Sequence, residues 1–363
     1  MKINKKFWNK KKILITGHTG FKGGWLTVLL SLLNCKISGY ALNPEGKFNF
    51  FNATGIKKIL KYDFRKKIES FSELKKSIDR VKPEIIFHLA AQSSVIESFK
   101  NSRNTISSNI IGTSNLLEAC KDNKKVKCII IITTDKVYQN YKQIKNFDEN
   151  SLLGGDDVYS GSKACCEILV NSYKKSFFKN SKCNIATVRA GNCFGGGDWT
   201  KDRIVKDALE SFYLNKDLIL RSPEATRPWQ HVIEPLTGYL KLAEKLCSKK
   251  GQKFAGPWNF GPSSLQNMKV IDLAKLIKNT MKSKSKIKVK KKDKRFQNKK
   301  FKVFESKFLN INSSKSLRKL KWKSRLPISR SVLLTTNWYN GFKNKEKLLY
   351  LTINQIKSYI KLN

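Results

Sequence analysis

Three side chains capable of proton transfer follow directly on an apolar run near the middle of the chain. The run Cys128–Ile132 (CIIII) has the length of a buried strand, and Thr134, Asp135 and Lys136 come just after it. In a parallel sheet these residues lie beyond the carboxyl end of the strand, where such sheets bind ligands. A hydroxyl, an acid and an amine side by side therefore indicate proton-transfer chemistry.

A tyrosine and a lysine in the segment VYSGSKACCE form a second reactive pair. Tyr159 and Lys163 are four residues apart, which places both on one face of a helix. A phenol with a pKa of about 10 is a poor base at neutral pH, but a nearby ammonium and an oxidised nicotinamide would stabilise its phenolate. With Thr134 hydrogen bonded to the same substrate hydroxyl, the set predicts a hydride-transfer site for a secondary alcohol.

A glycine-rich loop supplies the nucleotide site that this chemistry needs. The predicted strand Lys12–Thr16 leads into TGHTGFKGGW, in which Gly17, Gly20 and Gly23 are spaced three apart before an apolar helix. Glycines there let the backbone approach a pyrophosphate, and the helix N-terminus offers free N–H groups and a favourable dipole. The pattern and its position favour a dinucleotide site over a simple tight turn.

The acidic partner expected for the adenosine ribose is missing from the second strand. That strand ends in GYALNPEG, with Asn43 where an acid would stand in an NAD site. Local residues therefore leave NAD and NADP both open. Asp63, in KYDFR, is a candidate contact for the adenine end, with an ordinary surface carboxylate as the alternative.

These motifs are embedded in alternating strands and helices. We predict strands at residues 12–16, 36–42, 84–89, 128–132 and 184–189, and helices at 25–34, 106–121, 159–178 and 234–247. The alternation predicts an α/β fold: a Rossmann-like, doubly wound parallel sheet covered on both faces, with a smaller α/β C-terminal substrate-binding lobe. We expect the domains to interleave, with residues 1–190 and 231–261 in the cofactor-binding part and 191–230 and 262–363 in the lobe.

Charge and composition admit two interpretations. The formal net charge is +46, which can signal nucleic-acid binding, but the lysines are scattered through nearly every segment. We favour a general composition bias over a nucleic-acid site. The densest tract, residues 278–302, is either a loop or an anion-binding surface.

Targeting and metal signals point to an ordinary cytosolic protein. The longest apolar run near the N-terminus, residues 25–33, is far shorter than the roughly 20 residues of a membrane-spanning helix, and no signal-peptide cleavage pattern follows the basic start. The eight cysteines include no CxxC pair and the three histidines are not clustered. We therefore expect a cytoplasmic protein with neither a metal site nor a disulfide framework, and vicinal Cys165 and Cys166 as packing residues.

Several motifs in order carry a family resemblance. TGHTGFKGGW, HLAAQ, NIIGTSNLLEAC, YSGSK and VRAGNCFGGGDW resemble the extended short-chain dehydrogenase/reductase family. Within it, TTDKVY, GGDDVYSGSK and RPWQHVIEPLTGYL are similar to the sugar-nucleotide 4,6-dehydratases, and closely so to the branch that acts on CDP-glucose. The resemblance covers almost the whole chain, weakens in the lysine-rich tract and resumes at residue 304.

The resemblance implies NAD as a tightly held cofactor and CDP-glucose as the substrate. The implied cofactor contacts are Gly17, Thr19, Gly20, Phe21, Lys22, Gly23, Asp63, Leu89, Ala90, Ala91, Tyr159 and Lys163. The implied substrate contacts are Gln92, Asn192, Trp199, Arg203, Arg221 and Arg227. Arginines suit the diphosphate because their planar fork binds two oxygens at once. The alternative for Arg203 and Arg227 is an ordinary surface charge.

A dehydratase of this kind oxidises C4 of the sugar, removes the C5 proton, expels the C6 hydroxyl and returns hydride to C6. The resemblance implies that Asp135 is the general acid for the leaving hydroxyl, which requires a protonated and therefore desolvated carboxyl; an ion pair with Lys136 is the alternative. Lys136 stands where related dehydratases carry a glutamate base. It acts either as the C5 base, which we favour, or as a cation that stabilises the enolate.

Partners and rival functions complete the expectations. Asn115, Glu118 and the helix from Tyr159 lie on elements that pack as a four-helix dimer interface in the family, so we expect a homodimer. A sugar-nucleotide 4-epimerase would use Tyr159, Lys163 and Thr134 but needs no acid and base at the strand end. A cofactor-dependent nucleic-acid-binding regulator would use the basic surface, and the intact reactive set speaks against it.

Overall fold

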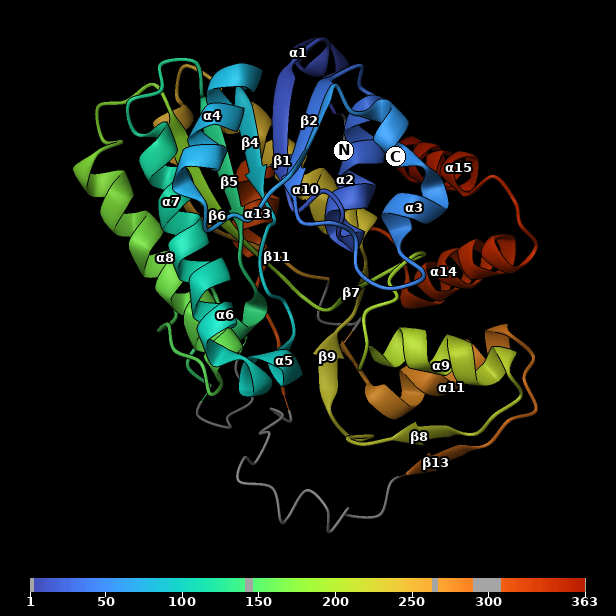
Figure 1. Ribbon diagram of the computed structural model, residues 1–363. Helices are drawn as coiled ribbons and strands as arrows, with labels where there is room; N and C mark the ends of the chain where they lie inside the picture. The colour runs from blue at the N-terminus through green and yellow to red at the C-terminus, as the bar shows by residue number, and fades with distance from the viewer. Residues whose placement is uncertain (1–2, 141–145, 263–266, 290–307, 363) are drawn as a thin grey trace.

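A seven-stranded parallel sheet forms the centre of the protein (Figure 1). The computed structural model describes residues 3–140, 146–262, 267–289 and 308–362. The strands lie in the order β11-β6-β5-β4-β1-β2-β3, and every neighbouring pair is parallel. They are β1 (Lys12–Thr16), β2 (Lys36–Ala41), β3 (Tyr62–Arg65), β4 (Ile85–His88), β5 (Cys128–Ile132), β6 (Asn184–Ala190) and β11 (Gly256–Phe260). The chain order reverses between β1 and β4, the switch point where such sheets bind ligands.

Helices cover both faces of the sheet, as Figure 1 shows. On one face lie α4 (Phe71–Val81), α5 (Val95–Lys100), α6 (Ser102–Ile106), α7 (Gly112–Cys120) and α8 (Val158–Ser176). On the other lie α1 (Lys5–Trp8), α2 (Phe21–Ser31), α3 (Phe50–Thr54), α10 (Ile233–Leu246), α13 (Ser314–Leu320) and α15 (Leu348–Lys361). Short helical turns are η1 (Ile56–Ile59), η2 (Ser107–Ile111), η3 (Asp135–Val137) and η4 (Gly251–Phe254).

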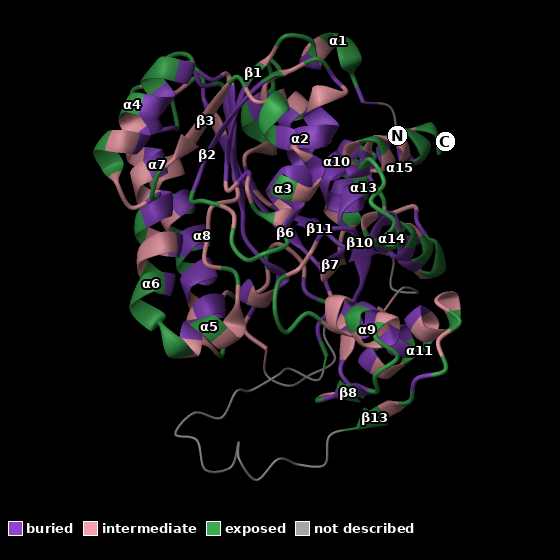
Figure 2. Cartoon of the chain, turned by 45° about the vertical axis from the view of Figure 1, so that its right-hand side comes forward, coloured by how far each residue is buried: buried purple, intermediate pink, exposed green. Residues whose placement is uncertain are grey.

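The central strand β5 is apolar at every position because both of its faces are buried. In β5, Ile129 and Ile131 pack with the α4, α7 and α8 side, whereas Cys128, Ile130 and Ile132 pack with the α2 and α10 side. This alternation follows from the two-residue period of a strand. Figure 2 shows the buried sheet between the two helix layers. The fully apolar CIIII run is therefore a central strand, which fixes the residues after it at the ligand-binding edge.

A smaller group of elements lies beyond the carboxyl ends of the strands, at the lower right of Figure 1. There α9 packs on α11, and two short two-stranded sheets pair β8 with β13 and β9 with β12. The elements are β7 (Cys193–Phe194), α9 (Ile204–Tyr213), β8 (Leu218–Leu220), β9 (Thr226–Pro228), β10 (Gln230–His231), β12 (Asn267–Lys269), α11 (Val270–Thr280), β13 (Ile287–Val289) and α14 (Ile328–Lys343).

The predicted fold class is confirmed, and the boundaries of its elements shift slightly. Helix α2 begins at Phe21, four residues before the predicted start, because its first turn includes the glycines of the loop. The helix predicted over 106–121 is interrupted by the π-helical turn η2 before α7. The part of the lysine-rich tract from residue 290 lies outside the described residues.

The domain boundaries stay a prediction, but the packing bears on them. We expected helices α13 and α15 in the lobe. In the structure, α13 contacts α10 and β11, and α15 contacts α2 and α3. Trp322, Trp338 and Ile356 from this C-terminal segment belong to the same apolar core as Ile13. The end of the chain therefore packs on the sheet as well as beside the lobe.

Candidate active site

Thr134, Asp135 and Lys136, which we call the reactive turn, lie at the carboxyl end of β5, as the sequence predicted. Thr134 caps the short helical turn η3: its Oγ1 accepts the amide hydrogen of Lys136 at 3.3 Å. The same hydroxyl donates to Oδ1 of Asp135 at 3.1 Å. The turn therefore places a hydroxyl, a carboxyl and an amine in consecutive positions at the switch-point edge of the sheet.

Asp135 has the environment that a general acid needs. Its side chain is buried, with 3% of the residue exposed, and its Oδ2 has no hydrogen-bond partner among the described residues. Burial raises the pKa of Asp135, while Lys136, the Thr134 hydroxyl and Arg227 act in the opposite direction. A buried oxygen without a partner is uncommon, and it indicates a group that meets a ligand.

Lys136 lies beside this acid and is partly exposed. Its charge is the largest influence opposing the burial of Asp135. The ion-pair interpretation and the catalytic interpretation of Asp135 therefore both involve the same neighbour, and the structure brings the two residues together as predicted.

Helix α8 brings the tyrosine and lysine to the turn. It starts at Val158 because Asp157 caps it, accepting the amide hydrogen of Ser160 at 2.9 Å. The Tyr159 phenol is hydrogen bonded to the Thr134 side chain. Burial raises the pKa of Tyr159, while this hydrogen bond and the charges of Arg203 and Lys22 oppose the rise.

Lys163 is buried one helical turn further along α8. Its Nζ donates to the carbonyl oxygen of Ile132, the last residue of β5, at 3.1 Å. Burial lowers the pKa of Lys163. The contact fixes the side chain at the end of the strand, two residues before Thr134.

The glycine loop has the shape of a phosphate cradle. Gly17 has a φ of +75°, and a Cβ there would lie 2.6 Å from the amide nitrogen of Ala90. A Cβ on Gly23 would lie 2.2 Å from the Gly17 carbonyl oxygen. Gly20 is the N-cap of α2, and no described side chain caps that end of the helix. A Cβ added to Gly20 would have one described neighbour within 4 Å, the Gly17 carbonyl oxygen at 3.4 Å. The helix N-terminus is therefore open to an anionic group.

Neighbouring loops complete the wall around the glycines. The amides of Leu89 and Ala90 donate to the carbonyl and the hydroxyl of Thr16, at 3.0 and 3.2 Å. Thr19 Oγ1 donates to the carbonyl of Leu42 at 3.1 Å. The predicted cofactor residues Gly17, Thr19, Gly20, Phe21, Gly23, Leu89, Ala90 and Ala91 thus come from two adjacent loops.

Asp63, the predicted contact of the adenine end, is held by two neighbours. Its Oδ1 is bonded to His18 Nε2 at 2.9 Å and its Oδ2 accepts from Arg65 at 2.8 Å. Although burial acts to raise the pKa of Asp63, the bonds from His18 and Arg65 lower it below its ordinary value. Asp63 is therefore an ionised, fixed carboxylate, and its contact with adenine stays a prediction.

Lys22 joins the reactive cluster as well as the glycine loop. Burial acts to lower its pKa, but Cys193, Tyr239 and Tyr159 raise it. The charge of Lys22 also acts on Asp135. Cys193 and Tyr239 were not among the predicted site residues, because β7 and α10 reach this place only through the fold.

Two of the predicted arginines face the reactive residues. Arg227, on β9, has 3% of its surface exposed, and its charge acts on Asp135. Arg203, the N-cap residue of α9, acts on Tyr159. The surface-charge alternative is therefore poor for buried Arg227, whereas Arg203 is an exposed residue with its charge directed at the site.

The other predicted substrate residues have structural contacts of their own. Arg221 is ion paired with Asp202 at 3.1 Å on the surface, and Trp199 packs its ring on Phe48, Trp338, Tyr339 and Phe342. Gln92 Nε2 donates to Thr105 Oγ1 at 2.7 Å, and the carbonyl of Asn192 accepts from Gln230 at 3.0 Å. Their contacts with substrate stay predictions.

The sequence missed Asn109, which lies in the π-helical turn η2. Its Nδ2 donates to Ser162 on α8 at 2.8 Å and to the carbonyl of Gln92 at 3.1 Å. It also accepts the Gln92 amide hydrogen at 2.9 Å. The asparagine thus joins the loop after β4 to the helix of Tyr159, and the helical pattern of residues 106–121 gave no sign of the π-turn.

The described residues form no cluster of metal ligands and no membrane-spanning helix. Across those residues, no three or more His, Cys, Asp or Glu side chains are grouped so that they could hold a metal ion. All eight cysteines are free thiols, with Cys165 exposed and Cys166 buried. Within 3–140, 146–262, 267–289 and 308–362, every helix is too short or too polar to cross a membrane.

The chain is similar in sequence to known sugar-nucleotide dehydratases. A family model described as GDP-mannose 4,6 dehydratase matches residues 14–333. The CDP-glucose 4,6-dehydratase of Salmonella typhimurium is 34% identical over 99% of this chain and 98% of its own length. The dTDP-D-glucose 4,6-dehydratase of Bos taurus is 26% identical over 93% of this chain and 92% of its own.

Solved structures share the fold. The dTDP-glucose 4,6-dehydratase from Bacillus anthracis, in complex with NAD, superposes with a TM-score of 0.75 at 21% identity, covering 93% of this chain and 99% of that one. The UDP-glucose 4-epimerase from Thermotoga maritima, with UDP-glucose, gives a TM-score of 0.76 at 20% identity, covering 92% and 99%.

Proposed function

The chain belongs to the GDP-mannose 4,6-dehydratase family, and on that premise we propose that it converts CDP-glucose to CDP-4-dehydro-6-deoxyglucose and water. The observation that carries the reaction type is the buried Asp135 carboxyl, whose Oδ2 has no partner among the described residues and whose pKa is raised. An elimination needs such an acid for the leaving oxygen, whereas an epimerisation at C4 does not. The choice of CDP is supported by the CDP-glucose 4,6-dehydratase of Salmonella typhimurium, which is 34% identical over 99% of this chain.

NAD fits the open end of α2. The residues that would hold it are the backbone of Gly17, Gly20 and Gly23 at the pyrophosphate, and Lys163 at the nicotinamide ribose. Bound NAD supplies reversible two-electron oxidation, first at C4 of the sugar and then in the reverse sense at C6. Because the two uses cancel within one turnover, the reaction needs no external reductant.

Tyr159 takes the proton of the C4 hydroxyl on its phenolic oxygen. The hydrogen bond between Tyr159 and Thr134 orients both groups toward one substrate oxygen. Arg203 and Lys22 are the cations that act on the phenol and favour its ionised form, against the effect of burial. The ketone that forms at C4 acidifies the proton on C5.

Asp135 and Lys136 then remove water across the C5–C6 bond. Lys136 takes the C5 proton on Nζ, and Asp135 gives the proton on its carboxyl to the C6 oxygen as the C–O bond breaks, so that one water leaves. The alternative for Lys136 is to stabilise the enolate while another group takes the proton. The closeness of Lys136 to Asp135 supports either role, since each needs the lysine nitrogen at the same bond, as a neutral amine for the base and as a cation for the enolate.

The diphosphate is bound by arginines at the entrance to the lobe. Arg203 and Arg227 direct charge at Tyr159 and Asp135, which supports a substrate anion held just beyond the reacting sugar. Asn192, Trp199, Arg221 and Gln92 complete the proposed contacts. Binding the diphosphate there orients C4 toward Tyr159 and C6 toward Asp135.

The first experiment tests reaction and nucleotide together. Purified protein is incubated separately with CDP-glucose, UDP-glucose, dTDP-glucose and GDP-mannose without reductant. The masses of the products are then measured by mass spectrometry. Loss of one water from CDP-glucose alone is the expected result. Loss of water from another sugar nucleotide instead would overturn the nucleotide assignment, and isomerisation without change of mass would mark an epimerase. Tyr159→Phe protein serves as the control for contaminating activity.

A homodimer through α7 and α8 is part of the proposal. Ile168 and Phe177 are 57% and 50% exposed on or just after α8, and Ile106 and Ile111 are also exposed at the adjoining helical turns. A second copy would cover these apolar side chains. Ile168→Lys should give a monomer in light scattering, while Leu317→Lys on α13, an equally polar change at an exposed leucine, should not. A wild-type monomer would contradict the proposal.

A further inference from the structure

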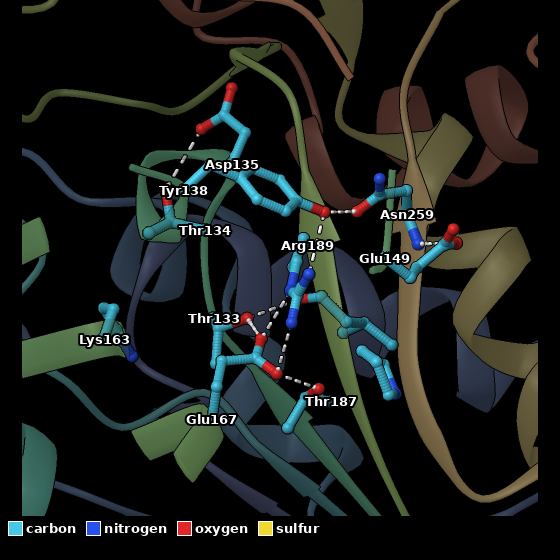
Figure 3. Close-up of polar contacts among 12 residues, drawn as sticks. Thr133, Thr134, Asp135, Tyr138, Glu149, Lys163, Glu167, Thr187, Arg189 and Asn259 are labelled. Atoms are coloured by element: carbon cyan, nitrogen blue, oxygen red, sulfur yellow. Dashed lines mark hydrogen bonds and ion pairs between the residues drawn. The ribbon is translucent and has the colours of Figure 1, made fainter. Parts of the chain in front are cut away.

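A buried ion pair lies beneath the reactive turn, as Figure 3 shows. Arg189 Nε donates to Glu167 Oε1 at 2.9 Å, and Arg189 Nη2 donates to Glu167 Oε2 at 3.0 Å. The arginine and glutamate side chains are only 3% and 4% exposed. Because a buried ion pair gives little net stability, its presence calls for another reason.

The ion pair is bonded to both flanks of the reactive turn. On one side, Thr133 Oγ1 donates to Glu167 Oε1 at 2.6 Å. On the other, Arg189 donates to the hydroxyl of Tyr138 at 2.8 Å. Thr133 and Tyr138 stand immediately before and shortly after Thr134, Asp135 and Lys136. The turn is therefore held at its two ends by one charged pair.

The same pair is part of the helix that carries the other reactive residues. Glu167 is on α8, four residues after Lys163 and eight after Tyr159, so the three side chains share one helix face. The turn and the helix are thus joined through a single carboxylate, below the place where Thr134 and Tyr159 meet.

The network continues to the edge of the sheet. The Tyr138 hydroxyl donates to Asn259 Oδ1 on β11 at 2.7 Å. The main-chain nitrogen of Asn259 donates to Glu149 Oε1 at 2.8 Å. Asn259 Nδ2 donates to the carbonyls of Phe147 and Asn312 at 3.0 and 3.1 Å. A buried network whose members are satisfied is rigid, and this one ties the turn to three strands.

We propose that Glu167 and Arg189 are positioning residues that hold the reactive turn against α8. They touch neither substrate nor cofactor, and they set the place of Asp135 and Lys136 relative to Tyr159 and Thr134. The inference rests on the proposed function, in which the two sets act in turn on neighbouring carbons of one sugar ring. A displacement of about 1 Å between such groups can lower a rate by about 100-fold.

Two conservative variants each remove one of the two hydrogen bonds that join the ion pair to the flanks of the reactive turn. Thr133→Val removes the hydroxyl that reaches Glu167, and Tyr138→Phe removes the hydroxyl that reaches Arg189 while keeping the ring stacked on Phe147 at 5.0 Å. The matched control is Thr187→Val, because Thr187 donates to the other oxygen of Glu167 from β6 and not from the turn. Thr133→Ser keeps the hydroxyl and should restore the wild-type behaviour.

We expect each flank variant to lower kcat by about tenfold or more with little change in KM. Thr187→Val, with a similar loss of thermal stability, should stay within about twofold of wild type. Hydrogen exchange, followed by mass spectrometry on peptides that span residues 133–138, should be faster in both flank variants and unchanged in the control. Equal kcat and equal exchange in all three variants would show a merely structural pair and overturn the proposal.

The exchange measurement separates this proposal from the proposed function. If wild-type protein dehydrates none of the sugar nucleotides, the function fails, and the exchange rates alone still decide whether the pair holds the turn. If wild type is active and the flank variants match Thr187→Val in both readouts, the positioning role fails while the function stands.

Discussion

The hydroxyl of Thr134 lies 3.1 Å from Oδ1 of Asp135, and the same side chain is hydrogen bonded to the Tyr159 phenol. In the proposed mechanism, one threonine therefore links the residues for oxidation with the acid for water loss. Because Oδ1 is engaged, the buried Oδ2 is the oxygen to which we assign the proton that goes to the substrate.

Replacing Tyr159 with Phe should abolish the first step. Without the phenolic oxygen nothing takes the proton of the C4 hydroxyl, so kcat should fall by about 100-fold or more. Near-ultraviolet absorbance after mixing with CDP-glucose should show no reduced cofactor. Tyr173→Phe is the matched control, since that phenol lies fourteen residues further along the same helix and donates to Glu118 at 3.2 Å. A normal absorbance change in Tyr159→Phe would refute the role.

Asp135→Asn should separate oxidation from water loss. The amide keeps the shape of the side chain but has no acidic proton, so reduced cofactor should accumulate while water loss slows by about 100-fold or more. Rapid mixing with absorbance detection and mass spectrometry of the products measures the two steps. Asp122→Asn, at an exposed position, should behave as wild type. Water loss at the wild-type rate would exclude Asp135 as the acid.

Lys136→Met tests the base. The apolar chain preserves length without a basic nitrogen, so C4 oxidation should persist while product formation stops. A base role also predicts that exchange of the C5 hydrogen with deuterated water is lost, whereas an enolate-stabilising role predicts that exchange is slowed but measurable. Product formed at close to the wild-type rate would rule out both roles. Lys124→Met, on the surface before β5, is the control.

The raised pKa of Asp135 makes a pH prediction with a definite sign. A general acid must be protonated, so kcat should fall as the pH rises through the raised pKa. For stability, a carboxyl whose folded-state pKa is raised contributes fully below its unfolded pKa, and the contribution is lost as the pH rises through the folded pKa. Asp135→Asn should therefore gain melting temperature over wild type in mildly alkaline buffer and not in acidic buffer. An equal difference at both pH values would contradict the shift.

The sequence by itself determined the parallel sheet and supplied most of the candidate reactive residues. The CIIII run, the glycines before an apolar helix and the four-residue spacing of Tyr159 and Lys163 are local patterns, and their order along the chain favours one arrangement. Side chains directly after an apolar central strand must emerge at its carboxyl end, so Thr134, Asp135 and Lys136 could be placed without the fold.

Only the tertiary structure decided what surrounds these residues. The desolvation of Asp135, the approach of Lys22, Arg203 and Arg227, and the π-turn at Asn109 depend on elements that are distant in sequence. The bonds of Glu167 to Thr133 and Arg189 likewise join α8, β5 and β6, whose relative placement no local pattern encodes. Burial and through-space charge arise when segments pack together. The candidate reactive groups could therefore be predicted from the sequence, but the shifts of their pKa values could not.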